Sequence, residues 1–99
     1  MKVIWHETAL LALQNILAYI THRESLQVAK KVVRELKNKA NGLSVFPEKY
    51  QRETLIQTNR NIRRIVVHSY KILYEIHPDH IRILDIFHTS QSPDKLDDL

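Results

Sequence analysis

The stretch that decides the fold is Tyr70-Lys71-Ile72-Leu73-Tyr74-Glu75-Ile76, in which aromatic and β-branched residues occupy every second position. This period of two is typical of a half-buried β-strand, because successive side chains point to opposite faces of a sheet. The pattern places Tyr70 and Tyr74 on one face, where we expect them to form core or the wall of a groove.

Two further strands are predicted beside this one in the sequence, at Ile62–Val67 and Ile81–Phe87. The segment His77-Pro78-Asp79-His80 joins the last two as a turn, since proline and aspartate favour turn positions. The third strand carries two apolar pairs, Ile81 with Ile83 and Leu84 with Ile86. If each pair lies on its own face, this strand is buried on both sides.

The preceding part of the chain is helical. No glycine or proline occurs between His6 and Asn41, and the apolar period there fits a helix. We predict two helices with a break at residues 21–25, because one helix of that length is unusual in a small domain. Ser25 is the expected N-cap of the second helix. Gly42 is expected to end it in the left-handed conformation. The two apolar stripes consist of Ala9, Leu10, Leu13, Ile16, Leu17 and Ile20, and of Val28, Ala29, Val32, Leu36 and Ala40.

The element order predicts an α+β fold. A short strand at Met1–Trp5 completes the series β-α-α-β-β-β, in which a helical hairpin packs on a small, mainly antiparallel sheet. The 99 residues suit a single domain spanning 1–99. Residues 43–61 form the least regular stretch, and the polar tail at 90–99 is expected to be loosely held.

The composition excludes several classes of site. One glycine in the whole chain rules out glycine-rich phosphate loops. The absence of cysteine rules out disulfides, thiolate metal ligands and cysteine nucleophiles. No apolar run is long enough to span a bilayer, and the first 20 residues lack the features of a signal peptide. We therefore expect a cytoplasmic protein with no membrane partner.

Positive charge is concentrated in the middle of the chain. Residues 23–71 hold twelve basic and four acidic residues, a net charge of +8, whereas the remainder carries −4. This distribution indicates a polyanionic or acidic partner for the middle segment. The lysines alone fit a solvated helix face, but the cluster of Arg60, Arg63 and Arg64 is a candidate for binding phosphates or an acidic partner. The structural alternative is that these arginines pair with acidic residues, namely Glu48, Glu53 or Asp85.

The order of elements, together with particular residues, resembles the RelE/ParE superfamily of bacterial type II toxins. The resemblance runs from Trp5 to about Leu96 and includes Tyr19-Ile20 at the end of the first helix and Phe46-Pro47 after the second. Its stronger carriers are the strand at 70–76 and the stretch Ile83-Leu84-Asp85-Ile86-Phe87-His88-Thr89. The resemblance implies a toxin neutralised by a cognate antitoxin. RelE-like members cut messenger RNA, mostly on the ribosome, whereas ParE-like members poison DNA gyrase.

Three residues match positions that the resemblance assigns to RNA cleavage. Arg64 lies near a family lysine on the first strand of the hairpin series, and Lys71 occupies the place of a family arginine. His88 ends the last strand, where some nuclease members use a histidine as acid or base and ParE-like members also carry one. Imidazole suits proton transfer near neutral pH, but a packing role for His88 is an equal alternative.

The nuclease set is incomplete in this sequence. RelE-like members carry an arginine after the final strand and then a tyrosine, whereas this chain reads Thr89-Ser90-Gln91-Ser92-Pro93 and has no tyrosine after Tyr74. We therefore favour a ParE-like toxin that acts by binding a target such as DNA gyrase. A metal-independent mRNA endoribonuclease is the alternative, and a non-toxic interaction module is the second.

We expect no cofactor and no metal. His77 and His80 have chelating spacing but lack an evident third ligand. A homodimer and a toxin–antitoxin hetero-oligomer are both compatible with the sequence.

Overall fold

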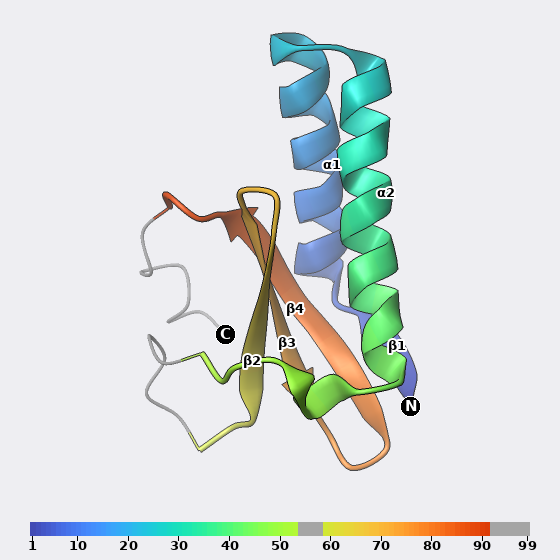
Figure 1. Cartoon of the computed structure of the whole chain (residues 1–99), viewed down its shortest axis with the longest axis vertical. Coiled ribbons are helices and arrows are strands. Elements are labelled where there is room, and N and C mark those ends of the chain that lie inside the picture. The colour runs from blue at the N-terminus through green and yellow to red at the C-terminus, as the bar shows by residue number, and fades with distance from the viewer. Residues whose placement is uncertain (54–58, 92–99) are drawn as a thin grey trace.

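A computed structural model of the chain describes residues 1–53 and 59–91. The predicted order β-α-α-β-β-β is confirmed, with a helical hairpin packed on one face of a four-stranded sheet (Figure 1). The elements are β1 (Lys2–Trp5), α1 (Glu7–Arg23), α2 (Leu26–Asn41), the 3₁₀ turns η1 (Gly42–Ser44) and η2 (Pro47–Lys49), β2 (Ile62–Val67), β3 (Tyr70–Ile76) and β4 (His80–His88).

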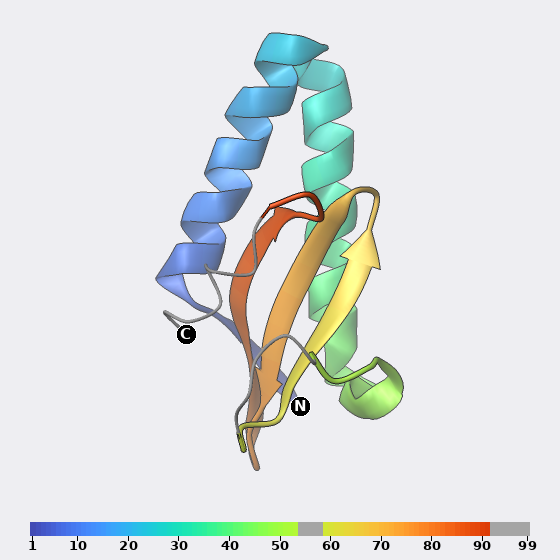
Figure 2. The ribbon, with the colours of Figure 1, turned by 90° about the vertical axis from the view of Figure 1, so that its left-hand side faces the viewer.

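The sheet has the strand order β1-β4-β3-β2 and is mainly antiparallel, as predicted. Only β1 runs parallel to its neighbour, and it pairs with β4 over His80–Ile83 alone. The second half of β4 therefore has one edge without a neighbouring strand among the described residues, which is the edge that faces α1 (Figure 2). The hairpin turn at residues 77–79 joins β3 to β4, also as predicted.

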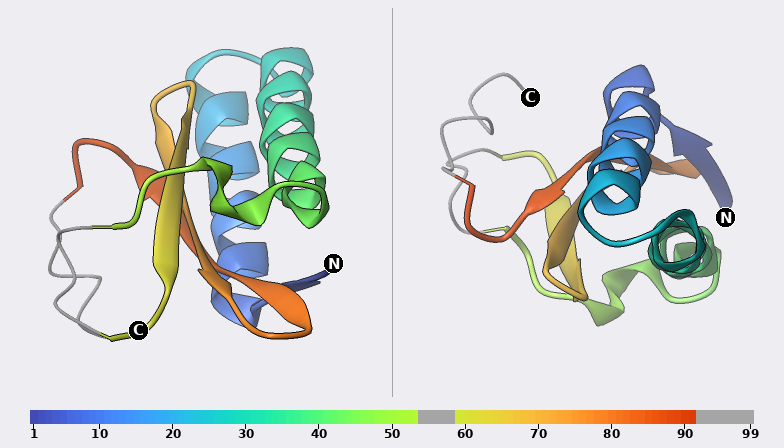
Figure 3. Two further views of the ribbon diagram at one scale, coloured as in Figure 1. Left: turned by 60° about the horizontal axis from the view of Figure 1, so that its bottom comes forward. Right: turned by 90° about the horizontal axis from the view of Figure 1, so that it is seen from above.

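The main core lies between the helices and the sheet. Seen along the helices, both pack on the same side of the sheet (Figure 3). Tyr74 is fully buried there, and Tyr70 is nearly so, which confirms the face predicted from their spacing. The helical stripes supply Ala9, Leu13, Ile16, Ile20, Ala29, Leu36 and Ala40 to this core.

Strand β4 is buried on both faces, but the prediction that Leu84 and Ile86 share one face is wrong. Ile86 belongs to the helix-side core, whereas Leu84 packs on the opposite face. The register with β3 shifts at this point, so that Leu84 has no partner between Ile83 and Asp85, which are both paired. A β-bulge inserts one residue into a strand and so resets the alternation of its faces.

The ends of α2 follow one prediction and depart from another. Ser25 is the N-cap, and its hydroxyl oxygen accepts a hydrogen bond of 3.1 Å from the backbone N–H of Val28. Gly42 is not left-handed; its φ of −67° is that of a right-handed helix. The reason is that the chain does not reverse at Gly42 but continues directly into the 3₁₀ turn η1.

Parts of two predicted segments lie outside the described residues. These are residues 54–58 of the irregular stretch and residues 92–99 of the tail. Among the described helices, none is long and apolar enough to cross a membrane.

Candidate functional site

Two of the predicted site residues meet on the outer face of the sheet, the face opposite the helices. Arg64 of β2 and Lys71 of β3 both approach the carboxylate of Glu53, at 3.9 Å and 3.1 Å. The Glu53 side chain is only 1% exposed. A charge buried to this extent needs compensating partners, and the two cations provide them.

The segment that carries Glu53 is held along the free edge of β2. The backbone N–H of Glu53 donates to the carbonyl of Ile62 (2.9 Å), and the N–H of Arg64 donates to the carbonyl of Gln51 (3.1 Å). The Arg64 guanidinium also donates to the Arg52 carbonyl and to the Gln51 side-chain oxygen. Arg64 thus holds residues 51–53 against β2. These residues follow the loop that lies beside β2 in Figure 3.

A second, smaller apolar cluster lies beside this ion pair. It consists of Ile62, Leu73, Leu84 and Phe87. The Lys71 ammonium lies 5.8 Å from the centre of the Phe87 ring, within the range of a cation–π contact. The side chains of Lys71 and Arg64 are only 15% and 23% exposed, so their charges are directed at Glu53 more than at the solvent.

The other two arginines of the predicted cluster are also engaged within the chain. Arg60 binds Glu75 in a bidentate pair, at 2.7 Å and 2.9 Å. The hydrogen bond from Arg60 lowers the pKa of the buried Glu75 carboxyl, against the opposing effect of burial. Arg63 donates to the backbone carbonyls of Glu48 (3.1 Å) and Tyr50 (2.7 Å).

The three arginines therefore do not form one binding patch. Arg63 and Arg64 are consecutive residues of a strand, so their side chains extend to opposite faces. The alternative prediction, that these arginines pair with acidic residues, is correct for Arg64 and Glu53. The main partner of Arg60, Glu75, is not among the acids expected from the sequence.

His88 lies on the other face of the sheet from Lys71 and Arg64. In the register of β3 and β4, Lys71 is opposite Phe87, and His88 is opposite Tyr70. Tyr70 is part of the helix-side core, and its ring meets the imidazole edge to face at 5.5 Å. The structure thus brings Arg64 and Lys71 together but separates His88 from both.

The His88 ring is held by the residues that follow it. The backbone N–H of Ser90 donates to Nδ1 (3.1 Å), and the Ser90 hydroxyl lies 2.7 Å from the same nitrogen. An Nδ1 that accepts from a backbone N–H leaves Nε2 as the protonated nitrogen of the neutral ring.

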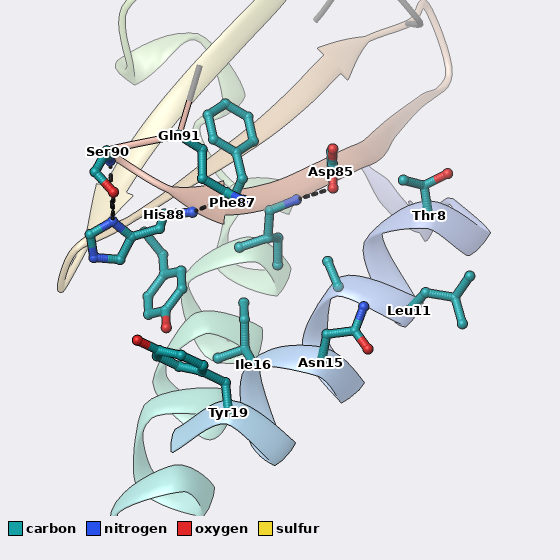
Figure 4. Close-up of a pocket in the computed structure, with 13 residues that line it drawn as sticks. Thr8, Leu11, Asn15, Ile16, Tyr19, Asp85, Phe87, His88, Ser90 and Gln91 are labelled. Atoms are coloured by element: carbon teal, nitrogen blue, oxygen red, sulfur yellow. Dashed lines mark hydrogen bonds between the residues drawn. The ribbon is translucent and has the colours of Figure 1, made fainter. Parts of the chain in front are cut away.

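A groove of about 800 Å³ lies between α1 and the second half of β4 (Figure 4). Leu11 and Tyr19 of α1 are half exposed in it, at 50% and 56%. Burial raises the pKa of the Tyr70 phenol in its wall, and the neighbouring phenol of Tyr19 adds to this effect. The groove is lined by Thr8, Leu11, Ala12, Asn15, Ile16, Tyr19, Tyr70, Asp85, Ile86, Phe87, His88, Ser90 and Gln91.

Side chains cover part of the open edge of β4 in this groove. The Asp85 carboxylate accepts from the N–H of Ile86 (2.8 Å), and the Gln91 side-chain oxygen accepts from the N–H of His88 (3.0 Å). N–H groups two residues apart point to the same edge of a strand. Occupied donors make an exposed edge a poorer template for an added strand, so the groove is better suited to a helix.

Comparison with known proteins agrees with this architecture. A family model described as the ParE toxin of the type II toxin–antitoxin system parDE matches residues 3–93. The chain belongs to the ParE toxin family. A solved structure of the chromosomal ParDE toxin–antitoxin system from P. aeruginosa is similar in fold, with a TM-score of 0.76. It is 16% identical in sequence, and the match covers 89% of this chain and 95% of that one. No curated protein sequence matches significantly.

The histidine pair of this ParE family member does not form part of a metal site within residues 1–53 and 59–91. No group of three or more metal-binding side chains occurs in that part of the chain. The His77 and His80 rings stack at 4.4 Å and are nearly parallel. Each also contacts a carboxylate, Glu75 for His77 and Asp79 for His80. The hydrogen bond from His80 lowers the pKa of Asp79.

Sequence reasoning missed the groove of this ParE toxin, although one signal pointed to it. Leu11 and Tyr19 lie outside the apolar stripe of α1, yet both are large and apolar. Large apolar residues on the outward side of an amphipathic helix indicate a second contact surface. Nothing in the sequence indicated that Arg60 pairs with Glu75, because this pairing depends on how the segment before β2 is placed beside β3.

Proposed function

We propose that this ParE family member is a growth-arresting toxin that acts in the bacterial cytoplasm by binding an essential target such as DNA gyrase, and that a cognate antitoxin neutralises it. The observation that carries the proposal is the placement of the candidate nuclease residues. His88 is on the helix-side face of the sheet, whereas Lys71 and Arg64 are on the outer face.

Metal-independent RNA cleavage requires these groups at one phosphate. A base must remove the 2′-hydroxyl proton while cations stabilise the charge that develops on the phosphorane, so the groups have to converge within hydrogen-bond reach. Here Lys71 and Arg64 already compensate the buried carboxylate of Glu53. This arrangement supports action by binding rather than by catalysis.

The groove beside α1 is the surface that we assign to the antitoxin. Its apolar wall is exposed, it is flanked by polar groups, and its volume suits the apolar face of an amphipathic helix. The similar P. aeruginosa structure is that of a ParDE toxin–antitoxin system, which agrees with a partner of this class.

The antitoxin hypothesis predicts a small reading frame adjacent to that of the toxin, whose product binds the toxin tightly. The test is induced expression of the chain with and without this adjacent frame. Growth, RNA 5′ ends and a DNA-damage reporter are followed together in wild type and in His88→Ala. We expect growth arrest with damaged DNA and unchanged RNA ends in both proteins, and relief of the wild type by the antitoxin. New RNA 5′ ends that depend on His88 would instead establish an endoribonuclease. Unaffected growth at verified expression of folded protein would leave an interaction module.

A further inference from the structure

The outward side of α2 carries an uninterrupted set of positive charges. We name this surface the α2 basic face; it consists of Lys30, Lys31, Arg34 and Lys37, all exposed. At about 100° per residue these four positions fall within roughly one third of the helix circumference. Opposite them, α2 packs against α1 and the sheet (Figures 1 and 3). The face runs about 10 Å along the helix from Lys30 to Lys37, at 1.5 Å per residue.

These four cations differ from the arginines near the sheet because they have no partner in the part of the chain that the structure describes. Within residues 1–53 and 59–91, none of the four side chains makes an ion pair or a side-chain hydrogen bond. Glu35 is the one acidic residue of α2, and it is paired with His68 in the turn between β2 and β3. The charge of the α2 basic face is therefore left for an external ligand.

The neighbouring residues limit the kind of ligand. On the same arc of the helix lie Gln27, Asn38 and Asn41, which are polar amides. The exposed apolar residues of α2, Leu26 and Val28, lie in its first turn, outside the arc of the four cations. Protein interfaces have apolar or aromatic anchors at their centres and are depleted in lysine, whereas this face has no aromatic residue and is mostly lysine. The composition fits a row of phosphates better than an acidic protein. Without aromatic platforms it also lacks the means to stack unpaired bases.

We propose that the α2 basic face binds the phosphate backbone of double-stranded nucleic acid without reading its sequence. The contacts would be charge-assisted hydrogen bonds from the three lysines and Arg34 to phosphate oxygens. This inference does not depend on the toxin activity proposed above. It concerns a surface on the other side of the hairpin from the groove, and its test measures binding alone.

The test is fluorescence anisotropy of labelled 20-base-pair duplexes of mixed sequence, one of DNA and one of RNA, titrated with the full chain. The double variant Lys30→Gln with Arg34→Gln removes two charges from the face. The matched control, Lys2→Gln with Lys39→Gln, removes two exposed charges that lie off the face, so the net charge is the same. Circular dichroism melting verifies that both variants fold.

With two to four phosphates neutralised, we expect the logarithm of the association constant to fall with the logarithm of salt at a slope of about −2 to −4. This slope corresponds to a loss of roughly 16- to 250-fold between 50 and 200 mM salt. The face variant should bind about tenfold more weakly at low salt, and its salt slope should be less negative by about two because two charges are removed. The affinity and the slope of the control should change little.

Several results would overturn the proposal. Equal weakening in both variants would mean that only net charge matters. Absence of binding to both duplexes, or tighter binding to a polyglutamate peptide that the face variant loses, would assign the face to solvent or to an acidic protein. Binding to one duplex and not the other would support the proposal and identify whether the source is DNA or RNA.

Discussion

The Glu53 carboxylate lies 3.1 Å from the Lys71 ammonium, although Glu53 sits beside β2 and Lys71 belongs to β3. The glutamate side chain therefore reaches across β2 on the outer face of the sheet. Arg64 belongs to β2, which lies between the Glu53 segment and β3, and it approaches the same carboxylate. One acidic side chain thus fixes the segment 51–53 to two strands and neutralises both cations that a phosphate would otherwise use.

Replacing Glu53 with Gln should destabilise the fold by about 2 kcal/mol, because it leaves Lys71 and Arg64 facing a neutral group in a largely dry site. Urea unfolding followed by circular dichroism measures the change. Glu48→Gln is the matched control, since Glu48 is exposed and, within residues 1–53 and 59–91, its backbone carbonyl rather than its side chain accepts the hydrogen bond from Arg63. Its effect should stay within about 0.5 kcal/mol. Equal stability of the Glu53 variant and wild type would show that the ion pair is not a stabilising element.

The Glu75–Arg60 pair should make stability depend on acid pH. The pKa of Glu75 is lowered in the fold from its ordinary value of 4.5, mainly by the hydrogen bond from Arg60. A lowered pKa means that the stabilisation is present above pH 4.5 and is lost as the pH falls through the pKa of the folded state.

The measurement compares wild type with Glu75→Gln in urea unfolding at neutral pH and at about pH 3. Because Arg60 is 39% exposed and its charge is screened by water, we expect a difference of only about 1 kcal/mol at neutral pH. The difference should shrink at the lower pH. A difference that is the same at both pH values would mean that packing, not charge, is responsible.

The alternating stretch at 70–76 was enough to predict β3, and the order of the predicted elements was enough to predict the class of fold. Its information is local, since a period of two requires only that one face be buried. The N-cap at Ser25 was also predictable, because capping involves only four consecutive residues, here Ser25 to Val28. Features that depend on a few neighbouring residues can be derived from the sequence alone.

The site depends on contacts between distant segments, and there the sequence was insufficient. The bulge at Leu84 moved Ile86 to the other face, because strand register is set by pairing partners rather than by the strand's own pattern. The three arginines were recognised as a cluster, but their spacing does not reveal that Arg60 would find Glu75. Whether a charged side chain is paired within the protein depends on which distant segments fold next to it. The order of residues along the chain does not reveal this.

Tyr74 provides a test at alkaline pH. Its hydroxyl donates a 2.6 Å hydrogen bond to the carbonyl of Pro47, which ties η2 to β3. Burial raises its pKa to about 12. Because a raised pKa means that the folded state holds its proton longer, stability should fall as the pH rises above 10, the ordinary value for tyrosine.

Tyr74→Phe should remove this alkaline component and cost about 1 to 2 kcal/mol at neutral pH, because the Pro47 carbonyl loses its donor. Absorbance titration of the tyrosinates checks the assignment, since the highest-pKa step should vanish in the variant. Tyr19→Phe is the control, because Tyr19 is 56% exposed and its hydroxyl makes no hydrogen bond within the described residues. Persistence of the highest step in Tyr74→Phe would contradict the assignment.

The groove makes the sharpest prediction about the partner. Leu11→Glu places a charge in the apolar wall that we assign to the antitoxin, and a charge buried without a partner in an interface is costly. Binding of the purified antitoxin should weaken by at least roughly 30-fold, which corresponds to about 2 kcal/mol. Isothermal titration calorimetry measures this, and growth rescue by the adjacent frame should fail in parallel.

Leu26→Glu is the matched control for that experiment. Leu26 opens α2 and is 49% exposed, close to the 50% of Leu11, but it does not line the groove. The same charge introduced there should leave antitoxin affinity within about threefold of wild type, since surface substitutions away from an interface have small effects. If Leu11→Glu and Leu26→Glu bind the antitoxin equally well, the partner uses a different surface, because a carboxylate in an occupied apolar groove cannot be accommodated without loss of affinity.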